Sequence, residues 1–284
     1  MEILQHPDIK ELIEIAIRED VGNGDHSSLA CIPSEKVGKA YCIAKENGII
    51  AGLELAAYIF KRIDSNLTFV PLKTDGDSIA KGDHVFEVFG SDISILTAER
   101  LVLNFMQRLS GIATQSKKMA LLLKDYHTTI LDTRKTTPGM RLLEKWAVQL
   151  GGCKNHRMGL YDMIMLKDNH IDFAGGVKQA IEKTHQYQKF KGLNLPIEIE
   201  TRNLDEVKQV LEVGGVSRIM LDNFKPEQLK EAIELIGGKF ETEASGGITM
   251  DNIEAYAASK VDFISVGALT HSSKSIDLSL RVSE

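Results

Sequence analysis

The sequence predicts an α/β protein in which a region of antiparallel strands precedes a parallel, barrel-like sheet. Between Val37 and Val88, short strands are separated by glycine-containing turns, which is typical of an antiparallel sheet. Beyond Gly111, apolar strands alternate with helical segments at least six times, which indicates a parallel sheet covered by helices. A complete barrel of about eight such units needs more residues than remain, so we expect a smaller or open barrel.

The first part of the chain is expected to contain three longer helices. Apolar residues at helical spacing predict one helix from Pro7 to about Arg18. A second is expected near Leu53 to Ile63, packed against the antiparallel sheet. A third is predicted from Ile95 to Leu109, and Gly111 is expected to mark the boundary after it.

The remaining chain is predicted to repeat strand and helix. After a helix over residues 112–126, we expect strands near Thr129, Met163, Ile197, Arg218, Phe240 and Asp262. The helices between them are expected at Pro138–Leu150, Val177–Gln188, Leu204–Val213, Pro226–Ile236 and Asp251–Ala258. Proline at two helix starts and glycine pairs after three helix ends are the usual signals of these boundaries.

The composition is that of a globular protein that folds in water. The chain has 284 residues, of which 43% are hydrophobic and 26% charged, and its formal net charge is -6. We find no apolar run that predicts a membrane span and no signal-peptide pattern, so the expected location is cytoplasmic. The three cysteines are widely spaced and predict neither a disulfide framework nor a zinc cluster. Cys153 lies near basic residues, but a catalytic thiol is the less favoured interpretation.

Cationic side chains gather between residues 130 and 170 of this acidic chain. Arg134 and Lys135 follow one apolar run, and Lys167 follows another, as expected of polar groups at the carboxyl ends of buried strands. Such a cluster favours a site for a small anionic ligand over a nucleic-acid surface. The alternative is a pair of solvated charge runs.

Acidic residues and glycines follow the later strands. Glu200 and Asp222 end two of them, where they suit a magnesium-bound diphosphate and a developing positive charge. The alternative is that they form salt bridges with Lys167 or Arg134. Glu198 shares a strand face with Glu200 and is the less favoured candidate. A glycine turn at Ser245, Gly246 and Gly247, before a helix near Asp251, is typical of a phosphate-binding loop.

A linked set of motifs carries a family resemblance. The stretch LDTRKTTPGMRLLEKWAVQLGGCKNHRMGLYDMIMLKDNHI resembles quinolinate phosphoribosyltransferases, as do EDVGNGD, LTAER, IEIET, MLDNF and SGGI, and the similarity covers nearly the whole chain. The resemblance implies an N-terminal α/β sandwich domain with an antiparallel sheet over 1–111, followed by an incomplete parallel α/β barrel over 112–270. We expect the segment 271–284 to return to the first domain.

The resemblance also implies a reaction and a set of roles. The enzyme would be a pentosyltransferase that joins quinolinate to 5-phosphoribosyl pyrophosphate, releasing nicotinate mononucleotide, pyrophosphate and carbon dioxide. Arg134, Arg157 and Lys167 would hold the quinolinate carboxylates. Lys135, Glu200 and Asp222 would be catalytic, with Glu200 and Asp222 holding Mg²⁺ through water. The other implied substrate-binding residues are Thr133, His156, Ser245, Gly246, Gly247, Val266, Gly267 and Ala268.

Arg100 lies outside the barrel strands, and the resemblance implies why it matters. The LTAER segment would reach into a neighbouring subunit, so that a homodimer shares Arg100 across its interface and assembles further in some cases. The alternative is a helix residue whose charge simply reaches solvent. Two alternatives to this functional interpretation are a family paralogue that acts on another small carboxylate and a non-catalytic anion sensor.

Overall fold

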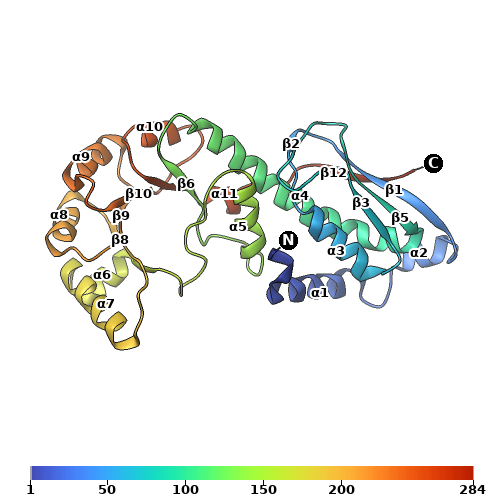
Figure 1. The fold of residues 1–284 in the computed structure, drawn as a ribbon, viewed down its shortest axis with the longest axis horizontal. Coiled ribbons are helices and arrows are strands. Elements are labelled where there is room, and N and C mark those ends of the chain that lie inside the picture. The colour runs from blue at the N-terminus through green and yellow to red at the C-terminus, as the bar shows by residue number, and fades with distance from the viewer. Residues whose placement is uncertain (1, 284) are drawn as a thin grey trace. The chain divides into compact units, whose positions relative to one another are not determined.

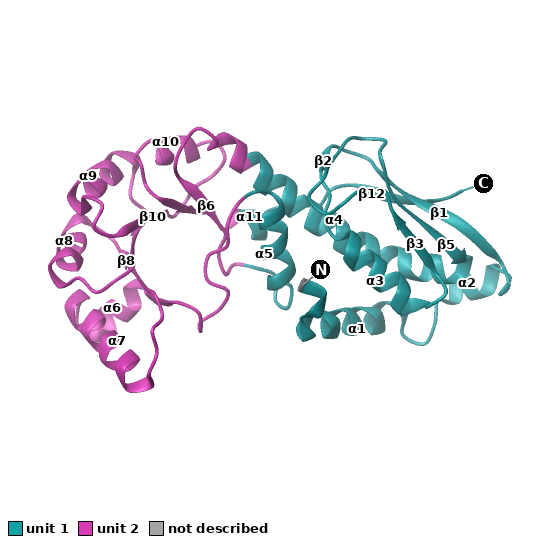
Figure 2. Ribbon diagram, in the orientation of Figure 1, with its two compact units in different colours: residues 1–118, 136–152, 269–284 teal, residues 119–135, 153–268 magenta. Residues whose placement is uncertain are grey.

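The computed structural model describes residues 2–283, and the chain divides into two compact units (Figure 2). The first unit comprises residues 1–118, 136–152 and 269–284, and the second comprises residues 119–135 and 153–268. The first unit contains η1 (Glu2–Gln5), α1 (Pro7–Val21), α2 (His26–Cys31), β1 (Val37–Ala44), β2 (Gly48–Ile49), α3 (Leu53–Ile63), β3 (Thr68–Pro71), β4 (Ser78–Ile79), β5 (His84–Ser91), most of α4 (Asp92–Leu122), α5 (Arg141–Leu150), most of α11 (Ala268–His271) and β12 (Leu278–Val282). The second unit contains β6 (Thr129–Leu131), β7 (Ile164–Leu166), α6 (Asp168–Ala174), α7 (Val177–Lys191), β8 (Ile197–Thr201), α8 (Leu204–Val213), β9 (Arg218–Asp222), α9 (Pro226–Ile236), β10 (Glu241–Ser245), α10 (Ile253–Ala257) and β11 (Phe263–Ser265).

The first unit is built on an antiparallel sheet of four strands in the order β12-β1-β5-β3. The last strand of the chain, β12, pairs with β1, so the C-terminal segment lies in this unit. Alternate residues of β5 and the apolar face of α3 form the core, in which Phe60, Phe69 and Phe86 pack together. Burial of such aromatic rings supplies much of the stabilisation of a small sheet and helix pair.

The second unit is built on a parallel sheet of six strands in the order β6-β11-β10-β9-β8-β7, with its helices on the outside (Figure 1). The strands β6 and β7 stand at the two ends of this order and do not pair with each other. A single bridge from Leu131 to Lys154 extends the sheet beside β6. The unit is therefore an incomplete barrel, and the predicted fold class is confirmed.

Two predicted helices prove to be one. The helix end expected at Gly111 is wrong, because α4 runs without interruption from Asp92 to Leu122. A Cβ at Gly111 would lie 2.0 Å from the carbonyl oxygen of Lys274. The glycine thus permits a close backbone approach within a helix and does not end it. Because α4 continues and residues 136–152 join the first unit, the compact units divide the chain differently from the expected domain boundaries.

The remaining differences concern short elements. The helix expected from Pro138 begins at Arg141, so Pro138 precedes the helix by a turn. The short helices α2 and α6 were not predicted, since six or seven residues leave too few positions for a helical period to show. By contrast, α3, α8 and α9 have the predicted bounds.

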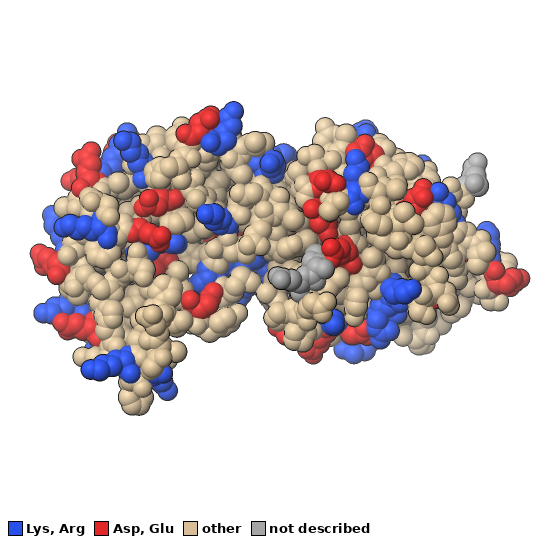
Figure 3. Space-filling model, in the orientation of Figure 1, with Lys and Arg blue, Asp and Glu red and all other residues tan. Residues whose placement is uncertain are grey.

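The surface carries both signs of charge in each unit. On the face drawn in Figure 3, basic and acidic side chains are interspersed over both units. Among residues 2–283, we find no helix that combines the length and apolar character needed to cross a membrane.

Candidate active site

The inner face of the parallel sheet is polar, which is unusual for a barrel of this size. In β8, β9 and β10, the residues that alternate toward the helices are apolar or small and fully buried, as Ile199, Leu221 and Ala244 show. The opposite faces of these strands carry charged and polar residues: Glu198, Glu200, Arg218, Asp222, Glu241, Glu243 and Ser245. The interior is therefore a site for charged groups.

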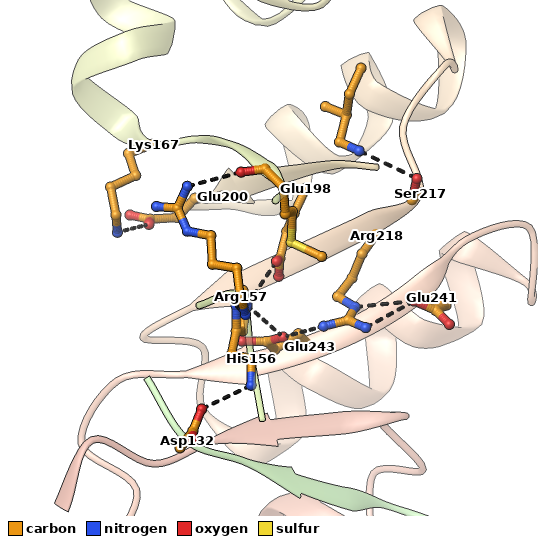
Figure 4. Close-up of polar contacts among 12 residues, drawn as sticks. Asp132, His156, Arg157, Lys167, Glu198, Glu200, Ser217, Arg218, Glu241 and Glu243 are labelled. Atoms are coloured by element: carbon orange, nitrogen blue, oxygen red, sulfur yellow. Dashed lines mark hydrogen bonds and ion pairs between the residues drawn. The ribbon is translucent and has the colours of Figure 1, made fainter. Parts of the chain in front are cut away.

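Two arginines lie together on the cationic side of this interior. Arg134 follows β6, and Arg157 follows the Lys154 bridge on the neighbouring segment. The guanidinium of Arg157 donates to the carbonyl oxygen of Met163 at 3.1 Å (Figure 4). Burial and the positive charge of Arg134 both lower the pKa of Arg157. Two neighbouring cations that repel each other are suited to binding a ligand with two negative charges.

Lys167 connects the cationic side to the acidic side. It follows β7, and its Nζ lies 2.9 Å from Glu200 Oε2 (Figure 4). The side chain of Lys167 is 49% exposed and that of Glu200 only 9%. The ion pair that was considered as the alternative role of Glu200 is thus present, and it leaves Lys167 accessible at the carboxyl ends of the strands.

Asp222 is held at the end of β9 by two neighbours. Ser245 Oγ donates to Asp222 Oδ1 at 2.5 Å, and Asn223 Nδ2 donates to Asp222 Oδ2 at 2.5 Å. Asn223 adopts a left-handed backbone with φ 58°, which turns its amide back toward the carboxylate. A carboxylate with both oxygens fixed in this way is oriented before any ligand arrives.

The predicted glycine turn follows β10, where its shape depends on having no side chain. Gly246 and Gly247 have φ 94° and 63°, and a Cβ at Gly246 would lie 2.1 Å from Asn223 Oδ1. Five residues separate this turn from the next helix, α10, which begins at Ile253. The turn therefore brings its backbone close to Asn223, the residue that follows Asp222.

The other predicted site residues of the barrel lie at the same carboxyl ends, whereas Arg100 lies in the first unit. Thr133 Oγ1 accepts a hydrogen bond from the backbone of the exposed Lys135. Val266 is buried and its N–H donates to the carbonyl of Leu131, while Gly267 follows it and Ala268 begins α11. Arg100 is exposed on α4 in the first unit.

The side chain of His156 is buried inside the barrel. Its side chain is 5% exposed, and Nε2 lies 2.9 Å from Glu198 Oε2 and 3.4 Å from Glu243 Oε2 (Figure 4). Burial by itself lowers the pKa of His156, but hydrogen bonds to the two carboxylates outweigh it and raise that pKa to about 9. Burial and the charge of Glu243 raise the pKa of Glu198, so the imidazole and the two carboxylates titrate as one group.

The backbone around His156 is anchored by a buried acid. Asp132 is fully buried after β6, and its Oδ1 accepts a hydrogen bond from the backbone N–H of His156 at 2.8 Å. The N–H of Arg157 in turn donates to His156 Nδ1 at 2.7 Å. Cys153, on the same segment, is buried, and burial and Asp132 raise its pKa to about 12, so a catalytic thiol is not supported.

Sequence reasoning missed three polar residues of the interior. Arg218, Glu243 and Asn223 were not singled out, although Asn223 adjoins a predicted position. The available signal was the period of two in IEIET, RIMLD and ETEAS, where charged residues occupy the face that a barrel normally fills with apolar side chains.

The chain matches known proteins over nearly its whole length. The model of the quinolinate phosphoribosyl transferase C-terminal domain matches residues 112–281, and that of the N-terminal domain matches residues 25–110. A chloroplastic carboxylating nicotinate-nucleotide pyrophosphorylase of Arabidopsis thaliana is 47% identical over 98% of this chain and 84% of its own length. A probable carboxylating nicotinate-nucleotide pyrophosphorylase of Bacillus subtilis is 41% identical over 98% of this chain and 95% of its own length.

Solved structures of such proteins have the same fold. The nicotinate-nucleotide pyrophosphorylase from Francisella tularensis superimposes with a TM-score of 0.92 at 39% identity, covering 99% of each chain. The one from Ehrlichia chaffeensis gives a TM-score of 0.91 at 31% identity, covering 96% of this chain and 98% of that chain.

Proposed function

The chain belongs to the quinolinate phosphoribosyltransferase family, and we propose that it transfers the phosphoribosyl group of 5-phosphoribosyl pyrophosphate to quinolinate with loss of carbon dioxide. The products are nicotinate mononucleotide, pyrophosphate and carbon dioxide, and the reaction belongs to NAD biosynthesis. The observation that carries the proposal is one barrel interior with a pair of cations on one side and fixed carboxylates beside a glycine turn on the other.

The cationic side suits the dicarboxylate. The charge of Arg134 lowers the pKa of Arg157, and quinolinate would relieve the repulsion between the two guanidinium groups with its two carboxylates. Lys167 supplies a third, more accessible cation. When quinolinate binds, Lys167 would leave Glu200, so that Lys167 could hold a carboxylate of quinolinate and Glu200 could act on the sugar.

The acidic side suits the phosphorylated sugar. Lys135, Thr133, Ser245, the glycine turn at 246–247 and the 266–268 loop offer hydroxyls, backbone N–H groups and a cation for phosphate oxygens. Glu200 and Asp222 provide carboxylate oxygens of the kind Mg²⁺ prefers, and contacts through water agree with their existing hydrogen bonds. Bound Mg²⁺ would neutralise charge on the departing pyrophosphate.

Positioning and charge drive the chemistry. The quinolinate ring nitrogen attacks C1 of the sugar, a nitrogen–carbon bond forms, and the bond from C1 to pyrophosphate breaks. Glu200 and Asp222 stabilise the positive charge that develops on the sugar. The ring nitrogen, now cationic, accepts the electrons left when the adjacent carboxylate departs as carbon dioxide, and a solvent proton replaces it. No general base is required, so orientation supplies much of the rate enhancement.

A pyrophosphate-release assay tests the function. Purified protein with quinolinate, 5-phosphoribosyl pyrophosphate and Mg²⁺ should release pyrophosphate and carbon dioxide in equal amounts. Activity with another carboxylate in place of quinolinate would indicate a paralogue with different specificity. Ligand binding without pyrophosphate release under every substrate combination would indicate an anion sensor.

Arg100 is proposed to act in a partner subunit's site within a homodimer. Its exposure on α4, outside the barrel unit, leaves its guanidinium available to another chain. Mixing impaired Arg100→Ala subunits with impaired Lys167→Ala subunits tests this. Action in trans restores activity, because each mixed dimer then contains one site with both residues intact. A mixture as inactive as its components shows that Arg100 acts in cis or not at all. Assembly beyond the dimer and a cytoplasmic location stay predictions.

A further inference from the structure

Four charged residues form a cluster beneath the proposed substrate-binding residues. His156 contacts Glu198 and Glu243, and Arg218 Nη1 lies 2.8 Å from Glu243 Oε2 (Figure 4). Two residues outside the cluster also contact Arg218. Its Nη2 lies 3.0 Å from Glu241 Oε2, and its Cζ lies 3.9 Å from the centroid of the Phe263 ring. Both Glu198 and Glu243 are fully buried, so their charges act on the interior with little screening by water.

A metal ion is a poor occupant of this cluster. Ligand atoms of His156, Glu198 and Glu243 lie within 4.8 Å of one another, a spacing that a metal ion can span. However, the guanidinium of Arg218 already supplies a cation to Glu243, and His156 Nε2 already carries a proton, because Nδ1 accepts the N–H of Arg157. A divalent ion would have to displace that proton against the repulsion of Arg218.

Packing alone does not explain why the barrel buries these charged residues. Among the described residues, Glu198 Oε1 and Glu243 Oε1 are buried without a hydrogen-bond partner. Two neighbouring buried carboxylates oppose folding unless their charges are fully compensated, and apolar side chains of similar size fill barrels at lower cost. Groups left in this state point to a role beyond packing.

The cluster reaches the substrate side through Arg157. His156 Nδ1 accepts the backbone N–H of Arg157, so fixing the imidazole fixes the start of the Arg157 side chain. The charge of Glu198 also favours the charged form of Arg157, and it opposes the effects of burial and of Arg134. Glu198 thus supports both the place and the charge of one of the two paired arginines.

We propose that Glu198 and Glu243 are positioning residues that hold Arg157 beside Arg134 and thereby set the preference for a ligand with two adjacent carboxylates. The inference rests on the proposed function for the identity of that ligand. It assigns the two glutamates no contact with substrate. Their effect is the counter-charge and the fixed imidazole beneath the arginine pair.

The test compares a dicarboxylate with a monocarboxylate. Calorimetry on the full-length protein gives the dissociation constants of quinolinate and nicotinate, which differ by one carboxylate. Glu198→Gln and Glu243→Gln keep side-chain size and should each reduce the preference for quinolinate about tenfold. Glu198→Asp keeps the charge and should therefore retain more of the preference for quinolinate than Glu198→Gln does. Glu206→Gln, on α8, removes a largely buried carboxylate charge that pairs with Arg202 outside the cluster, and it is the matched control, with the preference unchanged. A general loosening of the barrel would weaken both ligands equally and would overturn the proposal.

A double-variant cycle decides the route. If Glu198 acts through Arg157, adding Glu198→Gln to an Arg157→Ala protein should change quinolinate affinity by less than about twofold. Fully additive effects would overturn the proposal, as would a stoichiometric bound metal that Glu243→Gln removes. Either glutamate variant suffices if the other does not fold. Failure of the unaltered protein to bind quinolinate would instead refute the proposed function, and is seen before any variant is made.

Discussion

Each unit buries a glutamate beside an arginine, but the two carboxylates are treated differently. In the first unit, Glu144 is fully buried between α5 and α4, where it accepts hydrogen bonds from Arg108 and from the hydroxyl and N–H of Thr137. Both of its oxygens are used. In the second unit, Glu198 and Glu243 each retain a buried oxygen without a partner among the described residues.

The difference separates a structural ion pair from a functional one. Arg108 also donates to the carbonyl oxygens of Thr270 and Ser273, so its contacts join three segments of the first unit. Such a network fixes how the segments pack, and both oxygens of its buried carboxylate have hydrogen-bond partners. The barrel cluster leaves carboxylate oxygens without a hydrogen-bond partner in the described part of the chain, beneath the point where a charged ligand is expected, which is typical of a functional site.

The largest expected effect is on stability and falls in the first unit. Glu144→Gln removes one partner of a buried ion pair and should lower the free energy of unfolding by about 3–5 kcal/mol. Urea denaturation measures it, with activity per folded molecule unchanged. Glu14→Gln, in the exposed pair with Arg62, is the matched control and should leave stability nearly unchanged. Equal losses in the two variants would contradict the structural role of Glu144.

The next effect is on catalysis and falls at the acidic side of the barrel. Asp222→Asn keeps the shape of the side chain but removes the charge that faces the developing cation. Turnover should fall at least about a hundredfold, which corresponds to about 2.7 kcal/mol, with quinolinate binding little changed. Steady-state rates and calorimetry without the second substrate measure the two. A parallel loss of binding would place Asp222 with the quinolinate residues.

Smaller losses are expected when one cation is removed. Arg157→Ala and Lys167→Ala each remove charge-assisted contacts worth about 1.5–3 kcal/mol, so quinolinate affinity should fall at least about tenfold. Circular dichroism should show that both variants fold. Unchanged quinolinate affinity in both variants would remove these residues from the carboxylate site.

The smallest expected effect concerns the glycine turn. Gly246→Ala adds a side chain at φ 94° and 2.1 Å from Asn223 Oδ1, so stability should fall by about 1–3 kcal/mol and activity should fall with it. Gly238→Ala is the control, because Gly238 also has a positive φ, 73°, but open space around its Cβ position. If the two alanines have the same effect on activity, backbone strain alone matters and the contact with Asn223 does not.

Much of the fold could be predicted from local patterns. The strands of the parallel sheet begin within a residue or so of the predicted positions, because IEIET follows a proline, RIMLD follows a glycine pair after two residues, and both runs end in polar residues. The helices α8 and α9 have the predicted bounds, since capping residues and glycine pairs mark both ends. The predicted strands also indicated which polar residues share one edge of the sheet, because parallel strands bring their carboxyl ends to that edge.

The tertiary structure decided what local patterns leave open. Gly111 signals a helix end by composition, yet a backbone segment more than 160 residues later needs the space that it leaves, as the contact with Lys274 shows. The amino-acid sequence by itself determined the strands, most helices and the cationic and acidic residues at the strand ends, because those depend on neighbours along the chain. Only the tertiary structure decided that Glu198 and Glu243 contact His156 and that Arg218 pairs with Glu243, since three separate strands must come together before these charges can meet.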